Sequence, residues 1–276
     1  MALKNKAAAP STSDWQDISS VIVSGKPRRG VFMDVLGLEG MGKSSFALTL
    51  AELGPVGYVD IDQSVDRAKK PAGKKAREGV KILPVRYSPG MGEEATKSVC
   101  GPVWLDLEKK VRTAAETWAT GGIIIDTATE DWEVLRLGSF GTLNPKGNRM
   151  DRLYGPVNAR YRTHLRSVYR AAGRHLVTIH QLKDEYKDIV KNGVAQSIRT
   201  GKQNRSGFKE IGYLADVVIR VFRDGSNFKA RIELCKLAPN GPDLEGEEVE
   251  GDQLSFLSIV TLATGTEPGE WLPKSK

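Results

Sequence analysis

Short apolar runs recur along the chain, separated by stretches with helical periodicity. The runs cover residues 31–36, 56–61, 80–86, 122–126 and 175–180. Runs of this length with few polar interruptions are typical of parallel strands that are buried on both faces. Because strands alternate with helical stretches, the pattern predicts an α/β fold with a mostly parallel central sheet flanked by helices.

Helical periodicity predicts three helices, over Phe46–Leu53, Val103–Ala119 and Pro156–Gly173. In the third range, apolar side chains recur every three or four positions and would face the core. These side chains are Val157, Tyr161, Leu165, Val168 and Ala172. The polar stretch Ser88–Val99 is predicted to be a loop.

The C-terminal part of the chain predicts an antiparallel edge to this sheet. Val217–Phe222 and Phe228–Cys235 flank the turn sequence Arg-Asp-Gly-Ser-Asn, which favours a hairpin, and Leu254–Leu262 is predicted as a last strand. We therefore expect one core domain over residues 30–265. An extension over residues 1–29, a candidate oligomerisation arm, precedes this core, and a tail over residues 266–276 follows it.

The first apolar run leads into Gly37-x4-Gly42-Lys43-Ser44, and a helical stretch follows. Strand, glycine loop and helix in this order form a P-loop, in which backbone N–H groups bind phosphate oxygens. Lys43 would direct its charge at the β- and γ-phosphates, and the Ser44 hydroxyl would bind Mg²⁺. The sequence therefore predicts a site for ATP or GTP, formed by Gly37, Leu38, Glu39, Gly40, Met41, Gly42, Lys43, Ser44 and Ser45.

Polar residues stand at the ends of three further predicted strands. Asp126 ends one strand, Asp60 and Asp62 end another, and Gln181 directly follows a third. Because the carboxyl ends of parallel strands meet at one edge of a sheet, we expect these residues beside the P-loop. Asp126 would hold Mg²⁺, and a carboxylate at the second strand would take a proton from attacking water. Gln181 would hydrogen-bond the γ-phosphate and report its loss to the segment that follows.

Together these residues resemble the RecA family of ATPases, over about residues 31–222. The resemblance implies a RecA-like P-loop fold, ATP and Mg²⁺ as ligands, and ATP hydrolysis stimulated by DNA. It implies catalytic roles for Lys43, Asp62, Gln181 and the P-loop acid Glu39. Asp62 would be the base that activates water, where the family usually has Glu at a longer spacing from the P-loop lysine. Asp66 would lie near the adenine ring.

The resemblance extends to Ser206–Arg220, which is similar to the stretch after the family's second DNA-binding loop. Basic residues there reach the nucleotide of a neighbouring subunit, which makes Arg205 and Lys209 candidates to act in trans. The chain is most similar to phage-encoded RecA-like ATPases associated with single-strand annealing recombination. The partners implied are single-stranded DNA, further copies of the chain in a ring or filament, and a single-strand-binding protein.

Two basic segments are candidates for contact with DNA. Gln181–Gly207 is predicted to be a long loop, and long basic loops are uncommon unless they are functional or mobile. Its side chains would neutralise phosphates and make binding depend on salt. A second candidate loop is Arg136–Arg152. The DNA-binding candidates in the two segments, beside Arg205, are Lys183, Lys187, Lys191, Arg199, Lys202, Lys146 and Arg149.

Composition bears on the compartment and the class of partner that we expect for this chain. Its formal net charge of +7 over 276 residues permits a polyanion as partner. The two cysteines lack metal-ligand spacing, which favours a reducing compartment. The start of the chain has no signal-peptide core, and no stretch approaches the roughly 20 apolar residues that span a bilayer. We therefore expect a cytoplasmic protein (in the bacterial host, if phage-encoded) with no membrane partner.

Two other functions fit parts of the same pattern. A small-molecule kinase of the shikimate- or nucleotide-kinase type has a similar P-loop, and Asp60-x-Asp62 resembles the Asp-x-Asp that such kinases use for Mg²⁺ and the acceptor. The third hypothesis is a nucleotide-dependent assembly switch that acts on protein partners. Hydrolysis stimulated by single-stranded DNA, phosphate transfer to a metabolite, and assembly without either activity distinguish the three.

Overall fold

A computed structural model describes residues 30–68, 78–145, 150–171, 173–191, 194–237 and 243–272. The predicted N-terminal arm, residues 1–29, lies outside these ranges. Of the predicted tail, residues 266–272 are described, and the buried Trp271 packs against the core, where its indole lies beside the His175 ring.

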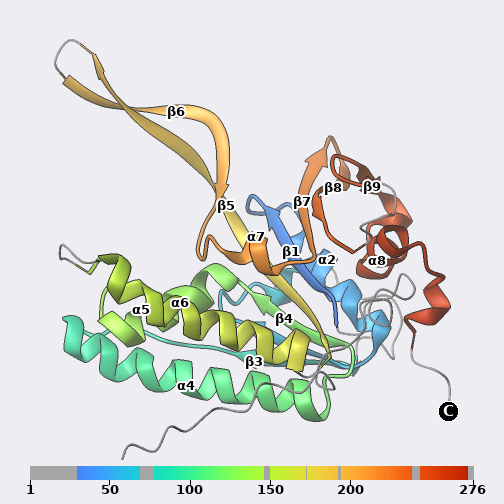
Figure 1. Cartoon of the computed structure of the whole chain (residues 1–276), viewed down its shortest axis with the longest axis horizontal. Coiled ribbons are helices and arrows are strands. Elements are labelled where there is room, and N and C mark those ends of the chain that lie inside the picture. The colour runs from blue at the N-terminus through green and yellow to red at the C-terminus, as the bar shows by residue number, and fades with distance from the viewer. Residues whose placement is uncertain are drawn as a thin grey trace, which may run out of the picture.

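One sheet organises the fold (Figure 1). Its strand order is β3-β2-β4-β5-β1-β7-β8-β9, and β6 pairs with β5 outside this path. Strands β1 to β5 and β7 are parallel along it, whereas β8 and β9 are antiparallel to their neighbours. A mostly parallel α/β sheet with an antiparallel C-terminal edge is thereby confirmed. The strands are β1 (Phe32–Gly37), β2 (Val56–Asp60), β3 (Val80–Pro84), β4 (Gly122–Asp126), β5 (His175–Lys191), β6 (Val194–Arg205), β7 (Val217–Asp224), β8 (Asn227–Cys235) and β9 (Glu248–Glu250).

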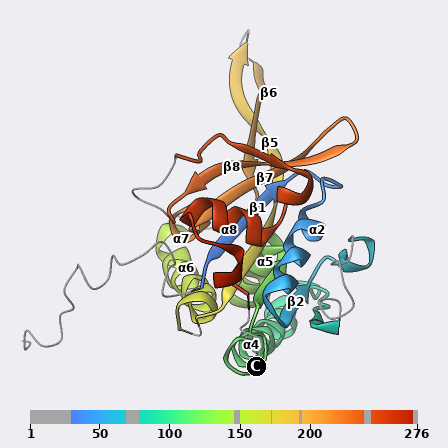
Figure 2. The same cartoon turned by 90° about the vertical axis from the view of Figure 1, so that its right-hand side faces the viewer.

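Helices cover both faces of the sheet, and each face has its own core (Figures 1 and 2). On one face, α4 (Glu93–Thr117), α5 (Ala128–Phe140) and α6 (Met150–Arg166) pack on strand residues such as Phe32 and Leu36. On the other face, α2 (Lys43–Ala47) and α8 (Phe256–Thr264) pack on Met33 and Val35. Alternate residues of β1 therefore serve opposite cores, which explains why the strand is apolar apart from Asp34. The short α7 (Ile211–Leu214) precedes β7.

The predicted last strand, Leu254–Leu262, is wrong, because this segment forms helix α8. Ser255 caps the helix by accepting a hydrogen bond from the Ser258 N–H, and Gly265 ends it in a left-handed conformation. Phe256, Ile259, Val260 and Ala263 are buried, at the i, i+3, i+4, i+7 spacing of one helix face. Cap and periodicity together outweigh the apolar run that suggested a strand.

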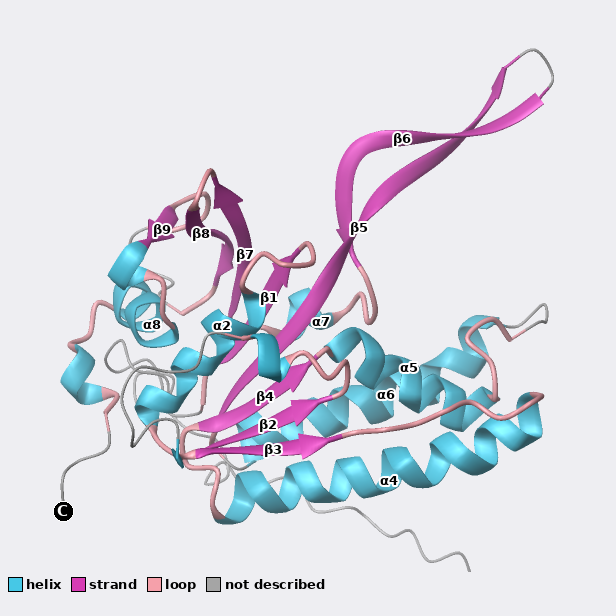
Figure 3. Cartoon of the chain, turned by 180° about the vertical axis from the view of Figure 1, so that it is seen from behind, coloured by secondary structure: helices cyan, strands magenta, loops and turns pink. Residues whose placement is uncertain are grey.

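The predicted loop Gln181–Gly207 is also wrong, because most of it forms a β-hairpin. β5 continues from the sheet as far as Lys191 and pairs with β6, from Leu182 opposite Arg205 to Lys191 opposite Val194. The hairpin extends away from the body of the protein (Figure 3). Polar side chains on both of its faces hide the alternation by which a strand is recognised in sequence.

On the first face, two helices begin earlier than predicted and α5 was not predicted. α4 begins at Glu93, inside the predicted loop Ser88–Val99, and Glu93 and Glu94 in its first turn interact favourably with the helix dipole. Pro102 lies inside this helix, where it removes one backbone hydrogen bond. α6 begins at Met150, and α5 occupies part of the predicted loop Arg136–Arg152.

A buried polar cluster lies between α4, α5 and α6. Asp131 accepts a hydrogen bond from the Tyr161 hydroxyl at 3.1 Å, and His164 Nε2 lies 3.8 Å from the same Asp131 oxygen. The edge of His164 also meets the ring of Trp104. Burial raises the pKa of Asp131 to about 7 and lowers the pKa of His164 to about 4. Each group therefore favours its neutral form inside the helical layer.

These two shifts predict opposing effects of pH on the free energy of unfolding. The stabilising contribution of Asp131 is full below its unfolded pKa of 3.8 and is lost as pH rises through about 7. The contribution of His164 is full above its unfolded pKa of 6.5 and is lost as pH falls through about 4. Asp131→Asn removes the contribution of Asp131 and leaves that of His164. We therefore expect the free energy of unfolding of this variant, relative to that of wild type, to increase with pH between about 4 and 6.5. The limiting slope is about 1.4 kcal/mol per pH unit.

Urea denaturation at a series of pH values measures this difference. His164→Gln is the matched variant, and its stability relative to wild type should fall as pH rises over the same range. If both variants follow the wild-type dependence, the cluster does not titrate as described.

Candidate nucleotide site

The P-loop connects β1 to α2 in a conformation that depends on glycine. Gly40 and Gly42 have φ angles of 75° and 86°, a region that favours glycine. At Gly37, an added Cβ would lie 2.7 Å from the carbonyl oxygen of Val221 on the neighbouring strand. Gly42 is the N-cap of α2, and its carbonyl accepts a hydrogen bond from the Phe46 N–H. The loop amides and the positive end of the helix therefore face the same space.

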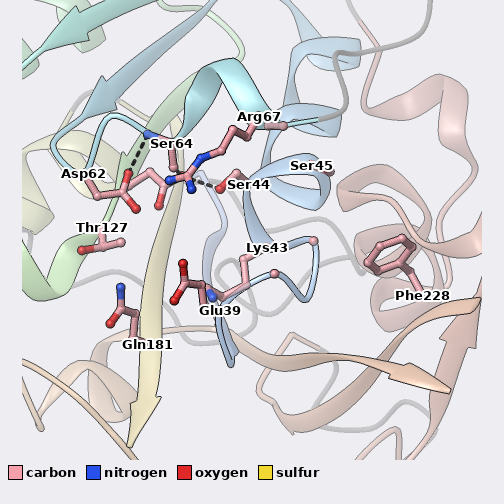
Figure 4. Close-up of a pocket in the computed structure, with 14 residues that line it drawn as sticks. Glu39, Lys43, Ser44, Ser45, Asp62, Ser64, Arg67, Thr127, Gln181 and Phe228 are labelled. Carbon is pink, nitrogen blue, oxygen red and sulfur yellow. Dashed lines mark hydrogen bonds between the residues drawn. The ribbon is translucent and has the colours of Figure 1, made fainter. Parts of the chain in front are cut away.

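That space is a cavity of about 460 Å³ at the carboxyl ends of the parallel strands (Figure 4). Three groups of residues line it. The P-loop contributes Glu39, Gly40, Gly42, Lys43, Ser44 and Ser45, and the strand ends contribute Asp62, Asp126 and Gln181. The third group consists of Ser64, Arg67, Ala68, Thr127 and Phe228. The sequence-predicted strand-end residues Asp62, Asp126 and Gln181 thus surround one cavity with the P-loop.

Lys43 is only 9 % exposed, and its Nζ donates a hydrogen bond to the Leu38 carbonyl at 2.7 Å. Burial lowers the pKa of this ammonium, and the nearby Asp126, Asp62 and Glu39 oppose the effect. The charge is therefore only partly solvated and lies beside the loop that would hold phosphate. A triphosphate would offer it stronger partners than one carbonyl oxygen.

Asp126 is buried and serves as the acceptor at the centre of the site. It accepts hydrogen bonds from the Ser44 hydroxyl at 2.6 Å, from the Ser64 hydroxyl at 3.1 Å and from the Tyr58 hydroxyl. Burial raises its pKa, and the negative charge of Asp62 raises it further. A cation placed here would reverse that effect.

The donor set at Asp126 fits a hard divalent cation. Ser44 supplies a hydroxyl and Asp126 a carboxylate, and Mg²⁺ prefers oxygen ligands of this kind. Among the residues that the structure describes, no group of three or more His, Cys, Asp or Glu side chains could hold a metal ion. The remaining ligands of Mg²⁺ would therefore be phosphate oxygens and water, as is usual for this ion.

The two acidic residues that follow β2 have different surroundings. Asp60 is buried, and its carboxylate accepts hydrogen bonds from the N–H groups of Ser64 and Val65, so it holds the turn in place. Asp62 accepts from the Ser64 N–H at 3.0 Å and lines the cavity. Of the pair, Asp62 is therefore the carboxylate placed to act on a ligand.

Gln181 reaches the cavity from β5, the strand between β1 and β4. It lies opposite Gly37 in the parallel register of β1 and β5, directly beside the start of the P-loop. Beyond this residue, β5 leaves the sheet and becomes the first strand of the hairpin. Gln181 therefore lies on the same strand that continues into the hairpin.

Of the other predicted nucleotide-site residues, some line the cavity and others do not. Leu38 and Met41 belong to the loop but do not line the cavity, and Glu39 lines it with an exposed side chain. Asp66 is exposed and does not line it, whereas the next two residues, Arg67 and Ala68, do.

The two predicted trans-acting residues differ in their surroundings. Lys209 is exposed. The side chain of Arg205 is only 16 % exposed, and its guanidinium forms a 2.6 Å ion pair with Asp34 of its own chain. Arg205 is thus paired within its own chain here, and a role in a neighbouring subunit stays a prediction for both residues.

Most of the DNA-binding candidates lie on the hairpin. Lys183, Lys187, Arg199 and Lys202 are exposed there, and Lys191 ends β5. Tyr186 and Ile198, two apolar side chains on the hairpin, are 60 % and 46 % exposed. An arm with exposed cations and an exposed ring offers both charge and a stacking surface to a polyanion. Lys146 and Arg149 lie outside the described residues.

Several cavity residues were not predicted from the sequence. Ser64, Arg67 and Thr127 lie within a few residues of Asp62 or Asp126. Their positions in polar turns beside these strand ends could have indicated them as cavity residues. Phe228 comes from the distant strand β8, and nothing in its local sequence indicates a role. Its ring packs against Gly42, where an added Cβ would lie 3.0 Å from it, and Arg223 lies over the ring. In Figure 4, Phe228 lies on the opposite side of the P-loop from Asp62.

Comparisons with known proteins give limited additional information. No family model matches the chain, and no curated protein matches it. The crystal structure of the RadB recombinase is similar, with 15% sequence identity and a TM-score of 0.43, over 84% of this chain and 91% of that chain. The fold of this chain is defined by its own strand order. No helix among the described residues combines the length and apolarity that crossing a membrane requires.

Proposed function

We propose that this chain is a RecA-like ATPase that hydrolyses ATP with Mg²⁺ and acts on single-stranded DNA in recombination, annealing or repair, as an oligomer. The observation that supports this proposal most strongly is the shared cavity. It joins the P-loop, the Ser44–Asp126 pair, Asp62 and Gln181, and the strand of Gln181 continues into a basic hairpin. Phosphate chemistry and a polyanion-binding arm are thus connected by one strand.

Each residue has a chemical role in this proposal. The loop amides and Lys43 stabilise negative charge on the β- and γ-phosphates. Ser44 and Asp126 would hold Mg²⁺, which would neutralise charge on the phosphate oxygens. Asp62 orients the attacking water and accepts its proton. Gln181 contacts the γ-phosphate, so hydrolysis removes one of its partners.

The nucleoside end of the ligand would lie beyond Ser45. Arg67, Ala68 and Phe228 also line the cavity. A guanidinium and an aromatic ring both stack on a planar base. Arg67 and Phe228 are therefore our candidates to contact the base, and the family resemblance implies that the neighbouring Asp66 lies near adenine.

The kinase alternative has less support from the site. A kinase of the Asp-x-Asp type needs both carboxylates for Mg²⁺ and the acceptor. Asp60 is occupied by the N–H groups of Ser64 and Val65, which leaves Asp62 alone to face the cavity. An assembly switch without catalysis would use the same cavity, and only activity measurements separate it from an ATPase.

Steady-state ATP hydrolysis, measured with and without an unstructured single-stranded oligonucleotide, tests the proposal. We expect slow release of phosphate by the protein alone and faster release with the oligonucleotide. Phosphate transfer to a metabolite without any DNA effect would support the kinase. Assembly that requires nucleotide, with neither activity, would support the switch.

The hairpin prediction concerns DNA affinity and its dependence on salt. Replacing Lys183, Lys187 and Lys191 together with glutamine should weaken binding of single-stranded DNA. Each phosphate contact contributes about 0.7 to the slope of log affinity against log salt, so losing three contacts should reduce the slope by about 2. Fluorescence anisotropy at several salt concentrations measures both quantities.

A matched control removes the same charge from another surface. Lys109, Lys110 and Arg112 are exposed on α4, away from the hairpin. Their replacement by glutamine should leave the slope almost unchanged. Equal losses in the two triple variants would mean that net charge, rather than the hairpin, determines DNA binding.

A further inference from the structure

A charged side chain lies in the middle of the buried P-loop strand. Asp34 is fully buried between the apolar residues Met33 and Val35. A carboxylate in such a place is tolerated only when it is paired and hydrogen-bonded. Its oxygens have three partners: the Thr178 hydroxyl at 2.8 Å, His180 Nδ1 at 2.7 Å and Arg205 Nη2 at 2.6 Å. We call these four residues the Asp34 cluster.

The cluster connects three parts of the proposed machinery. Asp34 lies three residues before Gly37, the first glycine of the P-loop. His180 directly precedes Gln181, which lines the cavity. Arg205 is the last residue of β6, the strand by which the hairpin returns to the core. The ion pair between Arg205 and Asp34 therefore joins the return strand of the hairpin to the P-loop strand.

Two hydrogen bonds at the next residue reinforce this junction. The Ser206 N–H donates to the Gln181 carbonyl at 2.9 Å, and the Thr129 hydroxyl donates to the Ser206 carbonyl at 3.1 Å. Thr129 stands in the first turn of α5, directly after the strand that ends in Asp126. A displacement of Gln181 or of the start of α5 would thus act directly on Ser206 and its neighbour Arg205.

Arg205 is the member of the cluster that can leave. Its side chain is 16 % exposed, so water or an anion can reach it, whereas Asp34 is fully buried. Without Arg205, Asp34 Oδ1 would keep the hydrogen bonds of Thr178 and His180, whereas Oδ2 would lose the one partner that it has among the described residues. Burial alone would raise the pKa of Asp34, but His180 and Arg205 hold it below its usual value, so the carboxylate stays charged. The junction can therefore have a paired arrangement and a costlier unpaired one, in which water would have to replace Arg205 at Oδ2.

We propose that Arg205 is a positioning residue, whose ion pair with Asp34 transmits the occupancy of the phosphate cavity to the hairpin. The inference rests on the proposed nucleotide site. It replaces a role for Arg205 in a neighbouring subunit with a role inside its own chain. When nucleotide contacts Gln181, the populations of the paired and unpaired arrangements change. The angle between the hairpin and the sheet changes with them.

Hydrogen–deuterium exchange, with and without a slowly hydrolysed ATP analogue and Mg²⁺, tests the proposal without DNA. In wild type, nucleotide should change exchange at the P-loop and also at the hairpin base, residues 182–184 and 203–206. In Arg205→Gln, the P-loop change should remain and the hairpin-base change should be lost. Arg205→Lys, which keeps the charge, should restore part of it. If Arg205→Gln fails to fold, Arg205→Lys tests the proposal instead, because its nucleotide-dependent change at the hairpin base should be smaller than that of wild type.

The matched control is Arg199→Gln. Arg199 lies on the same strand and also forms an arginine–aspartate pair, with Asp184, but that pair is exposed and remains within the hairpin. This variant should keep the full nucleotide effect at the hairpin base. A hairpin response that survives in Arg205→Gln, or is lost equally in Arg199→Gln, overturns the proposal.

The outcomes also separate this inference from the proposed function. If nucleotide changes exchange at the P-loop of wild type but not at the hairpin base, the positioning role is wrong and the nucleotide site stands. If nucleotide changes neither region, the nucleotide site and the inference built on it both fail. As a second readout, the ratio of DNA affinities with and without the analogue should fall from about tenfold, a typical coupling, to near one in Arg205→Gln.

Discussion

Replacing Lys43 with alanine is expected to abolish ATP hydrolysis and to leave the fold intact. Lys43 is the one cation of the P-loop, and its charge would act where negative charge accumulates during phosphoryl transfer. Loss of a single preorganised donor to such charge commonly costs about a hundredfold or more in rate. The only hydrogen bond of its Nζ within the described residues is to the Leu38 carbonyl, so folding depends little on it. Phosphate release measures the loss of hydrolysis, and thermal unfolding measures whether the fold is retained.

The matched control is Lys109→Ala, which removes an exposed lysine from α4. It should hydrolyse ATP at the wild-type rate. Unchanged turnover in Lys43→Ala would refute the assignment of the site, and a large fall in its unfolding temperature would show that Lys43 supports the fold instead.

Replacing Asp62 with asparagine is expected to lower kcat by about 10²–10⁴ and to change nucleotide affinity little. Asparagine keeps the size of the side chain and its hydrogen bond to Ser64 but cannot accept a proton from water. The loss should therefore appear in the chemical step rather than in binding. Single-turnover hydrolysis together with equilibrium binding of a fluorescent nucleotide separates the two.

Two other carboxylates serve as comparisons for Asp62. Asp60→Ala should retain turnover but lower stability by about 1 kcal/mol, because it removes the acceptor that holds the turn through Ser64 and Val65. Glu130, in the first turn of α5, was not predicted from the sequence. Burial raises its pKa to about 7, and Asp62 and other neighbouring acids add to the effect. If Glu130→Gln loses turnover while Asp62→Asn keeps it, the proton acceptor is Glu130.

The proposed phosphate-binding half of the site could be predicted because it is contiguous in sequence. Leu38 to Gly42 form one loop between β1 and α2 whose geometry follows from Gly40 and Gly42, and the buried runs around it predict parallel strands. Parallel strands bring their carboxyl ends together, which is why Asp62, Asp126 and Gln181 could be placed near the loop from their positions alone. That Asp60 faces its own turn while Asp62 faces the cavity depends on backbone geometry after the strand, which the pattern does not contain.

Other parts of the fold were misread for identifiable reasons. The hairpin after Gln181 has no buried face outside the sheet, so the alternation of polar and apolar residues that reveals strands is missing. Leu254–Leu262 is a short apolar run in which helix and strand look alike, and the cap at Ser255 settles the outcome. Phe228 reaches the cavity, and Asp34 reaches Arg205, only through tertiary packing.

A crystal structure with Mg²⁺ and a slowly hydrolysed ATP analogue is the most direct test of the central claim. The account predicts the triphosphate against the amides of Gly40 to Ser45, with the cation beside Ser44 and Asp126 and the γ-phosphate near Gln181. Nucleotide bound elsewhere on the protein, or no nucleotide in this cavity at saturating concentration, would contradict it.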